Sequence, residues 1–454
     1  MSVWTGLLQP PVSALLTGEP LRDFRRNRLE LKRRITGQPH RLTLWLRADD
    51  PQAFVLLQIL PDLVRQLPLE TGIRLLHGSD ADTCPEPQRQ QAFALDDARR
   101  QALRHGLMPP GDPPDAGRLA HAERLLLAVE CQALANPLSR AREIMSRLWQ
   151  PAAHAFTEPA DAASHAPDGH DGARTALAGI DAAEHGTRNR QAQRRAGHYA
   201  SAALHYGGEW YVGLDRLEHL RQRLAALGLG TLPSIPLVSP DDPSGADVIA
   251  PDGCTLQLFF SFRSPYSWLA LDRVRELADR HQLPLRLRPV LPMVMRGLPV
   301  PAIKRRYILL DAKREADRHG IPFGRICDPV GAGVERCMAV CHAARASGRD
   351  LAFASAAARR IWSEGEDMTR DAPLLAAAHE AGMSTGDVDA ALKHDDWREA
   401  AERHRADLFD AGLWGVPGLV LNRHGRRLAA TWGQDRLWVI TDTLQQLSRE
   451  TRHD

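Results

Sequence analysis

Along the C-terminal half of the chain, the spacing of apolar residues alternates between short runs typical of strands and the helical repeat of three to four residues. Two short apolar runs of strand length lie at 255–260 and 284–290, and a helical pattern at 264–281 separates them. Further helical patterns follow, rich in alanine, arginine and leucine, with glycine or proline at their ends. They lie at 303–319, 334–347, 351–364, 373–381 and 385–394, and helices are expected to continue to about 410.

The chain then returns to strands. Residues 418–422 and 427–431 are apolar runs separated by a turn, and a final helix is predicted from about Gln434. The order is therefore βαβ, a helical block at about 291–410, and ββα. This order predicts a thioredoxin fold that a helical insertion divides into two halves.

The first helix of this half begins on a serine at the end of a strand. Ser264 is a strong N-cap residue, and Pro265 suits the first helical position because the N–H it lacks would have no partner there. The Ser264 hydroxyl is therefore expected at the mouth of a helix. The N–H groups and the dipole there favour an anion, a thiolate included. Thioredoxin-like folds place the first cysteine of Cys-Pro-x-Cys here, and Ser264 and Ser267 occupy both cysteine positions.

The N-terminal half carries a weak copy of the same pattern. Residues 42–51 and 256–265 both combine a strand, a polar cap and a proline, at an offset of 214 positions. Residues 93–106 match 307–320 at the same offset, and two shorter matches follow in the same order. We therefore predict a tandem duplication of the α/β class. Its two thioredoxin-like domains would each carry a helical insertion between the βαβ and ββα halves.

Composition sets the predicted boundaries. Proline-rich residues 228–253 resemble a linker, and a stretch of alanine, histidine, aspartate and glycine at about 158–195 is expected to be a mobile insertion. The predicted parts are an N-terminal arm at 1–37, a degenerate thioredoxin-like domain at 38–227, the linker, and a catalytic domain at 254–454.

Charge and cysteine content exclude some classes of function. Lys and Arg number 58 and Asp and Glu 56, so the whole protein gives no argument for nucleic acid or an acidic membrane as a partner. The basic segment 25–41 is interpreted as a solvated helix or arm. No secretory pattern and no long apolar run is present, so we expect a cytoplasmic protein. The six cysteines form no C-x-x-C pair or metal-spaced cluster, so no metal is predicted.

Four motifs of the second domain carry a resemblance to a known family. They are FFSFRSPYSWLAL at 259–271, K-x-x-Y-x-x-x-D at 304–311, Gly-Val-Pro at 415–417 and WGQDRL at 432–437. With them, residues 255–450 resemble the 2-hydroxychromene-2-carboxylate isomerase and kappa-class glutathione transferase family, within the DsbA-like group. The resemblance implies a glutathione-dependent enzyme with a small-molecule substrate.

The resemblance also implies roles for single residues. Ser264 would hold the glutathione sulfur as a thiolate rather than act as a nucleophile, which agrees with the low thiol pKa found at helix starts. Val416, beside an expected cis peptide bond to Pro417, would pair with the cysteinyl backbone of glutathione. Asp435 and Arg436, at the expected start of the last helix, would bind the γ-glutamyl end. An ordinary helix-start pair is the alternative for these two residues.

A further set of candidate residues lies on the first helix of the insertion. Lys304, Tyr307 and Asp311 share one helix face, and the resemblance implies that Lys304 and Asp311 contact glutathione; a solvated face is the alternative. The asparagine that the family places shortly before this lysine has no counterpart in residues 293–301. Three arginines remain undecided candidates for a substrate carboxylate: Arg263, Arg296 and Arg305.

The favoured function is a glutathione-dependent isomerase acting on a conjugated aromatic keto acid. A thiolate would add reversibly, the carbon–carbon bond would rotate while single, and elimination would release the other isomer. The alternatives are a kappa-type transferase or peroxidase, and a non-enzymatic thioredoxin-fold protein that binds peptides through the edge at Val416 and Pro417. The missing C-x-x-C argues against a dithiol oxidoreductase.

The first domain lacks most of this chemistry. Asp50 replaces Ser264, Ala53 replaces Ser267 and Gln90 replaces Lys304, and the region near Gly197 carries no proline. A carboxylate at position 50 would cap a helix but repel a thiolate, so a non-catalytic domain is predicted. Because members of the family are generally homodimers, the two repeats are expected to form an intrachain pseudo-dimer, with a homo-oligomer as a further possibility.

Overall fold

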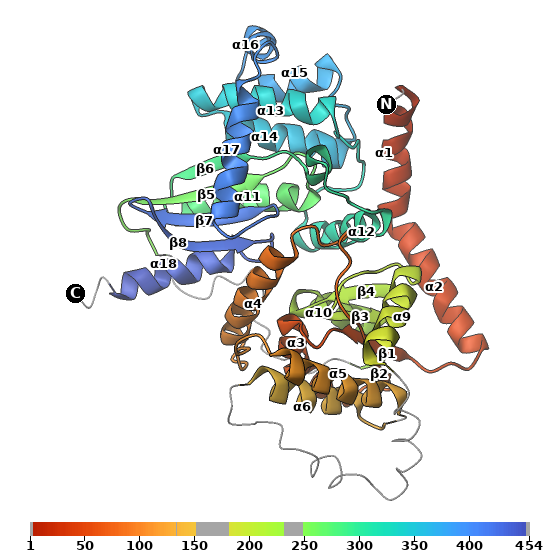
Figure 1. Ribbon diagram of the computed structural model, residues 1–454. Coiled ribbons are helices and arrows are strands. Elements are labelled where there is room, and N and C mark those ends of the chain that lie inside the picture. The colour runs from red at the N-terminus through yellow and green to blue at the C-terminus, as the bar shows by residue number, and fades with distance from the viewer. Residues whose placement is uncertain (1–2, 133, 151–180, 231–247, 451–454) are drawn as a thin grey trace, which may run out of the picture. The chain divides into compact units, whose positions relative to one another are not determined.

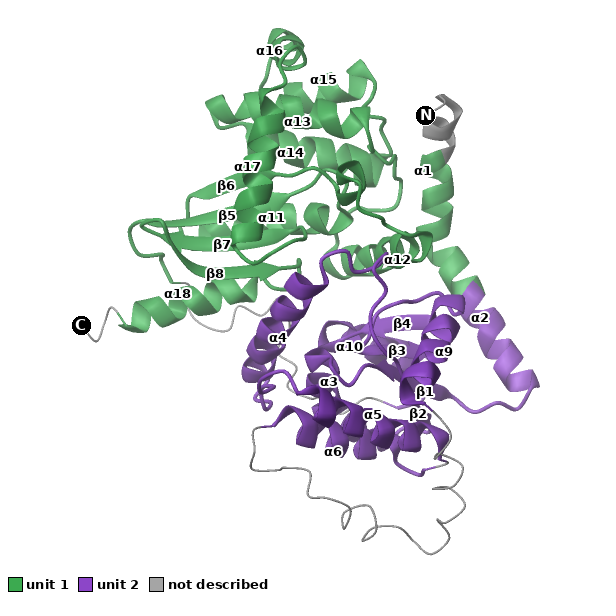
Figure 2. Ribbon diagram, in the orientation of Figure 1, with its two compact units in different colours: residues 1–24, 239–454 green, residues 25–238 purple. Residues whose placement is uncertain are grey.

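Two compact units make up the computed structural model, which describes residues 3–132, 134–150, 181–230 and 248–450 (Figures 1 and 2). Residues 25–238 form one unit, and residues 1–24 together with 239–454 form the other. The predicted arm at 1–37 therefore contributes residues to both units. Helix α1 (Val3–Thr17) belongs to the C-terminal unit, and the boundary falls within α2 (Glu19–Ile35).

The C-terminal unit is built on a four-stranded mixed sheet in the order β6-β5-β7-β8. β5 (Cys254–Phe260) pairs in parallel with β6 (Leu285–Pro289) and antiparallel with β7 (Gly418–Arg423). β8 (Arg426–Trp432) pairs antiparallel with β7 and forms the edge. Because β5 and β6 are parallel, their C-terminal ends lie on the same side of the sheet. Ser264, which begins the next helix, lies on that side.

Along the chain, helices and strands alternate in the predicted order. In the view of Figure 1, α17 crosses in front of β6 and β5. Alternate β5 residues Leu256, Leu258 and Phe260 point into one buried core that these helices cover. The helices are α11 (Pro265–Arg280), α12 (Ala302–His319), α13 (Ala332–Ala344), α14 (Asp350–Arg359), α15 (Asp371–Glu380), α16 (Thr385–Ala391), α17 (Asp396–Asp410) and α18 (Trp438–Glu450). The short helical turns are η3 (Met293–Arg296), η4 (Arg345–Ser347) and η5 (Arg360–Glu364).

The last helix begins later than the sequence pattern predicts. Gly433 adopts a φ of 111°, and the Arg436 N–H donates to the Gly433 carbonyl at 3.3 Å, so residues 433–436 form a turn. Gln434, the predicted helix start, is only 1% exposed because its side chain is used inside the protein. Asp435 and Arg436 therefore precede α18 instead of beginning it.

The N-terminal unit has its own sheet, in the order β2-β1-β3-β4. β1 and β2 are parallel, and the β1–β3 and β3–β4 pairs are antiparallel, so strand order and directions equal those of the other sheet. Its strands are β1 (Arg41–Leu46), β2 (Glu70–Leu75), β3 (Ala203–Tyr206) and β4 (Glu209–Val212). Its helices are α3 (Pro51–Val64), α4 (Pro87–Arg104), α5 (Ala116–Cys131), α6 (Pro137–Trp149), α9 (Ala182–Arg195), η2 (Leu214–Arg216) and α10 (Leu217–Ala225).

One buried hydrogen bond recurs in both units. Trp149 Nε1 donates to the Ala48 carbonyl at 3.0 Å, and Trp362 Nε1 donates to the Phe262 carbonyl at 3.1 Å. Each carbonyl lies two residues before the N-cap of the helix that follows the first strand. Each indole thus fixes the same strand-to-helix connection in its own unit.

The polar stretch predicted as a mobile insertion at about 158–195 is partly an ordered helix. Residues 158–180 lie outside the described part of the chain, but residues 182–195 form α9. Asp181 caps this helix by accepting the Ala183 N–H at 2.8 Å. Asn189 is buried and donates to the Leu75 carbonyl at 2.9 Å, which ties α9 to β2. α9 has few apolar residues to pack against the sheet, so the hydrogen bond from the buried Asn189 amide attaches it instead.

The buried imidazole of His404 on α17 gives a prediction for pH dependence. Burial lowers its pKa to about 4, and its Nδ1 donates to the Pro289 carbonyl at 2.9 Å. An unfolded histidine has a pKa of about 6.5, so the unfolded state binds the extra proton first as pH falls. The free energy of unfolding should therefore fall as pH is lowered from about 6.5 to about 4.

Urea denaturation at a series of pH values checks this expectation. His404→Gln should reduce the slope in that window by up to about 1.4 kcal/mol per pH unit. His394→Gln, which changes an exposed side chain, is the matched control and should leave the slope unchanged. Equal slopes for the wild type and His404→Gln would contradict the assignment.

Candidate functional site

Ser264 lies at the N-terminus of α11, as predicted. Its backbone is extended, with φ −105° and ψ 113°, and its Oγ accepts the Ser267 N–H at 3.1 Å. The same oxygen lies 3.5 Å from the Val416 carbonyl oxygen, its hydrogen-bond acceptor. Because this bond is long, the hydroxyl proton can turn to a stronger acceptor such as a thiolate without losing the helix cap.

The connection before α11 is fixed from inside the protein. Ser267 is fully buried, and its Oγ accepts the Ser261 N–H at 3.4 Å. Trp268 Nε1 donates to the Pro322 carbonyl at 3.2 Å. These contacts hold the first turn of α11 and therefore the direction of the Ser264 side chain. Ser267 thus acts in packing and does not present its hydroxyl to a ligand.

The Val416–Pro417 peptide bond is cis, as the resemblance implies. It directly precedes β7, and the Pro417 carbonyl accepts the Gly433 N–H at 2.9 Å. This hydrogen bond ties the cis bond to the turn that holds Asp435 and Arg436. Three of the four sequence motifs therefore meet at one edge of the sheet.

Two tryptophans beside this edge are functional candidates that the sequence prediction missed. The rings of Trp414 and Trp432 pack 4.9 Å apart, and Lys304 Nζ lies 5.6 Å from the centroid of the Trp414 ring. A Cβ on Gly415 would lie 2.5 Å from the Trp432 ring, so only glycine allows this packing. Each tryptophan directly precedes the glycine of a motif, which is the sequence signal that could have revealed the pair.

The three candidate arginines differ in their surroundings. Arg263 makes two hydrogen bonds of 2.7 Å to the carboxylate of Asp328. The Asp328 N–H in turn donates to the Gln9 side chain of α1 at 3.0 Å. Arg263 is therefore engaged within the protein, whereas Arg305 is exposed and Arg296 is half-buried. Arg263 consequently holds the segment before Ser264 and is the least suited of the three to bind a substrate.

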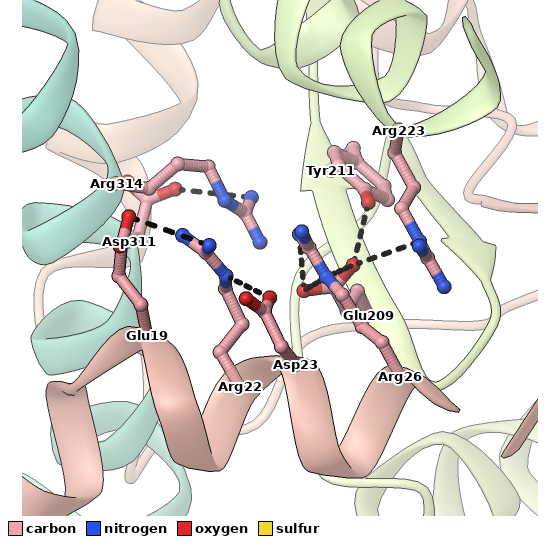
Figure 3. A network of polar contacts seen from close by, with 9 residues as sticks. All are labelled: Glu19, Arg22, Asp23, Arg26, Glu209, Tyr211, Arg223, Asp311 and Arg314. Atoms are coloured by element: carbon pink, nitrogen blue, oxygen red, sulfur yellow. Dashed lines mark hydrogen bonds and ion pairs between the residues drawn. The ribbon is translucent and has the colours of Figure 1, made fainter. Parts of the chain in front are cut away.

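Asp311 is buried beside Tyr266, which lies two residues after Ser264. Its side chain is 1% exposed and accepts the Tyr266 hydroxyl at 2.7 Å and the Tyr307 hydroxyl at 3.4 Å. Arg314 forms an ion pair with it at 3.8 Å, and Figure 3 shows this pair near the start of α2. A ligand would reach this carboxylate only if side chains moved. The contacts place Asp311 as a support for Tyr266, and its predicted contact with glutathione stays a prediction.

The matching aspartate of the N-terminal unit makes the same connection. Asp97 is 5% exposed and accepts the Gln52 side-chain amide at 2.9 Å. Gln52 and Tyr266 are both the second residue of the helix that follows the first strand. In each unit, a buried aspartate thus joins this helix to the next long helix.

Asp435 and Arg436 differ in exposure, although they are neighbours in one turn. Asp435 is half-buried, whereas Arg436 is 7% exposed and donates to the Asp435 carbonyl at 3.3 Å. Gln434 donates to the fully buried Glu315 carboxylate at 2.8 Å, and Arg273 donates to the Gln434 carbonyl at 3.2 Å. A buried polar cluster thus holds the turn, and Asp435 is the member that a ligand can reach.

The corresponding place in the N-terminal unit has different chemistry. Asp50 is the N-cap of α3 and accepts the Gln52 N–H at 3.0 Å. Burial raises the pKa of this carboxyl group. The prediction that Asp50 caps a helix is confirmed, so a carboxylate caps α3 where a hydroxyl caps α11 in the other unit. Within the described residues, no group of histidine, cysteine, aspartate and glutamate side chains is arranged to hold a metal ion.

Comparison with known proteins assigns the C-terminal half to a class. Residues 255–445 match the family model of the DSBA-like thioredoxin domain. This part of the chain therefore has a DsbA-like thioredoxin fold, as the order of elements predicted. The second thioredoxin-like domain predicted for the N-terminal half stays a prediction.

The relatives that match this part of the chain include a glutathione transferase and an isomerase of the predicted kind. Glutathione S-transferase kappa 1 of Rattus norvegicus is 27% identical over 200 residues, which cover 41% of this chain and 88% of the relative. The 2-hydroxychromene-2-carboxylate isomerase of Sphingobium xenophagum is 24% identical over 193 residues, covering 40% and 94%. A solved structure of a 2-hydroxychromene-2-carboxylate isomerase aligns with a TM-score of 0.37 and 20% identity, covering 44% and 98%.

Proposed function

We propose that the C-terminal unit is a glutathione-dependent isomerase of the 2-hydroxychromene-2-carboxylate type, acting on a conjugated aromatic keto acid. One observation carries the proposal. A hydroxyl donor, Ser264, stands at a helix N-terminus 3.5 Å from the carbonyl that precedes a cis proline. Donor, helix start and extended backbone together suit the cysteinyl part of glutathione.

The residues of the site fit glutathione at its sulfur end. Bound glutathione would supply a thiolate, the nucleophile of the proposed reaction. Ser264 would donate its hydroxyl proton to that sulfur while keeping the cap bond from the Ser267 N–H. The backbone of Val416 would pair with the cysteinyl amide, and the half-buried Asp435 would meet the γ-glutamyl amino group. Arg436 would orient the turn, because its side chain is buried.

The aromatic ring of Trp432 supports the proposed substrate class. Trp432 is half-buried and offers flat apolar surface close to Val416, whereas Trp414 is 3% exposed and packs against it. Flat conjugated molecules pack well on such a ring. Lys304, whose ammonium group lies over Trp414, supplies a positive charge for a substrate carboxylate. A kappa-type transferase or peroxidase would use the same thiolate, so a panel of substrates is needed to choose between these activities.

We also propose that the N-terminal unit is a decayed, non-catalytic copy that acts as an intrachain partner of the catalytic unit. The equal strand order, the two Trp hydrogen bonds and the two buried aspartates support a common origin. Asp50 in place of Ser264 supports the loss of thiolate binding. Association of whole chains into a homo-oligomer remains part of this proposal.

Isothermal calorimetry with glutathione tests the proposed function. The wild-type protein should bind glutathione, and Ser264→Asp should weaken binding at least about tenfold, because a carboxylate keeps the helix cap but repels a thiolate. Ser384→Asp is the matched control, since Ser384 caps α16 through the Asp387 N–H at 3.2 Å and is exposed. No binding by the wild type, with retained binding of an extended peptide, would favour the non-enzymatic alternative.

A further inference from the structure

Exposed apolar side chains concentrate on the two N-terminal helices. Ten large apolar side chains are strongly exposed among the described residues, and seven of them lie on α1 and α2. On α2, Phe24 is 62%, Leu31 59% and Ile35 76% exposed. No residue of this 17-residue helix is buried. Such a concentration on two consecutive helices marks a contact surface, because single exposed apolar residues are normally scattered.

The exposed residues of α2 lie on one side of the helix. At 3.6 residues per turn, Phe24, Arg28, Leu31 and Ile35 fall on a single strip, here called the outer strip. The opposite side is engaged within the protein. Arg26 forms an ion pair with Glu209 at 2.9 Å, and Figure 3 shows Arg22 and Arg26 projecting from this inner side. The inner contacts therefore fix which side of α2 faces away.

Charge defines the chemistry of the partner. α2 carries seven basic and three acidic side chains, and Arg28, Lys32 and Arg34 are exposed on or beside the outer strip. Two copies of so basic a helix would repel each other, which argues against self-pairing. Apolar side chains bordered by cations on a convex helix suit the boundary between head groups and acyl chains of an anionic lipid surface. A cavity of about 430 Å³ lies elsewhere, between α13 and α16.

We propose that the outer strip of α2 attaches this protein reversibly to anionic membrane surfaces. The attachment is in the plane of the surface, since no described helix has the length and apolar character needed to cross a membrane. Phe24, Leu31 and Ile35 enter the boundary region, and the neighbouring cations contact the lipid phosphates. This inference is independent of the proposed catalytic function. It revises the expectation, drawn from the net charge of the whole chain, that no membrane is a partner.

Co-sedimentation of the full chain with vesicles tests the proposal. Binding is expected with vesicles of equal parts phosphatidylglycerol and phosphatidylcholine, should weaken as salt is added, and should be at least about tenfold weaker with phosphatidylcholine alone. The triple variant Phe24→Ser, Leu31→Ser, Ile35→Ser should lower the partition coefficient at least about tenfold without changing the melting temperature. The matched control is Leu103→Ser with Met108→Ser, which removes apolar side chains that are 68% and 51% exposed away from α2.

Three results would overturn the proposal. The first is no binding of the wild type to the anionic vesicles. The second is an equal loss of binding in the control variant. The third is a triple variant that binds vesicles normally but melts at a lower temperature or has a smaller oligomeric state than the wild type, since the outer strip would then be covered by protein.

Discussion

Replacing Ser264 by alanine should raise the pKa of the thiol of bound glutathione and lower turnover roughly 10²–10³-fold, the usual effect of losing one donor to a developing anion. The physical reason is that the hydroxyl proton, now 3.5 Å from the Val416 carbonyl, would no longer be available to the sulfur. The thiolate absorbance of the complex, titrated against pH, measures the pKa directly.

Loss of the helix cap must be separated from loss of the donor. Ser264→Ala also removes the cap of α11, which costs about 1 kcal/mol. Ser384→Ala removes a comparable cap from α16 at a place without candidate ligands. The thiol pKa should move in the first variant and stay in the second. A titration that is unchanged in Ser264→Ala would falsify the role assigned to this serine.

Gln434→Leu should destabilise the C-terminal unit by about 3 kcal/mol, because it leaves the fully buried Glu315 carboxylate without its 2.8 Å donor. The same change should weaken glutathione binding, since the turn that holds Asp435 would lose its anchor. Hydrogen exchange over α12 and residues 433–437 measures the effect at the turn and at the helix that carries Glu315.

Gln446→Leu offers the control for this variant. Gln446 lies on α18 and is exposed, so the same chemical change there should alter protection in α12 by less than about 0.5 kcal/mol. If Gln434→Leu leaves protection in α12 equally unchanged, Glu315 does not depend on Gln434.

Local signals made the centre of the site predictable from the sequence. Ser264 and Pro265 form a helix start whose chemistry depends on adjacent residues, and the structure places it as expected. The same holds for the strand, helix and strand around it, because hydrophobic periodicity is a property of short windows. Family resemblance added the cis bond at Pro417, which composition alone would have left as an ordinary turn.

Contacts between distant segments were not predictable in the same way. The Trp414–Trp432 pair and the tie from Gln9 to Asp328 join residues far apart in the chain, so no window contains both partners. α9 was mistaken for part of a mobile insertion because its stability comes from the bond between Asn189 and β2, not from an apolar face. The start of α18 was misplaced because Gln434 is held by Glu315 from another helix.

The N-terminal helix has a consequence for synthesis of the protein. Ser13 of α1 accepts the Ile326 N–H at 2.9 Å, a bond between residues 313 positions apart, and belongs to the unit that is completed last. At about 5–20 residues per second, a ribosome needs roughly 15–60 s to supply the partner segment. During that interval residues 25–238 are synthesised, and α1 has not yet formed its hydrogen bond to Ile326. The C-terminal unit therefore becomes complete only after the segment around Ile326 has reached α1, which is made much earlier.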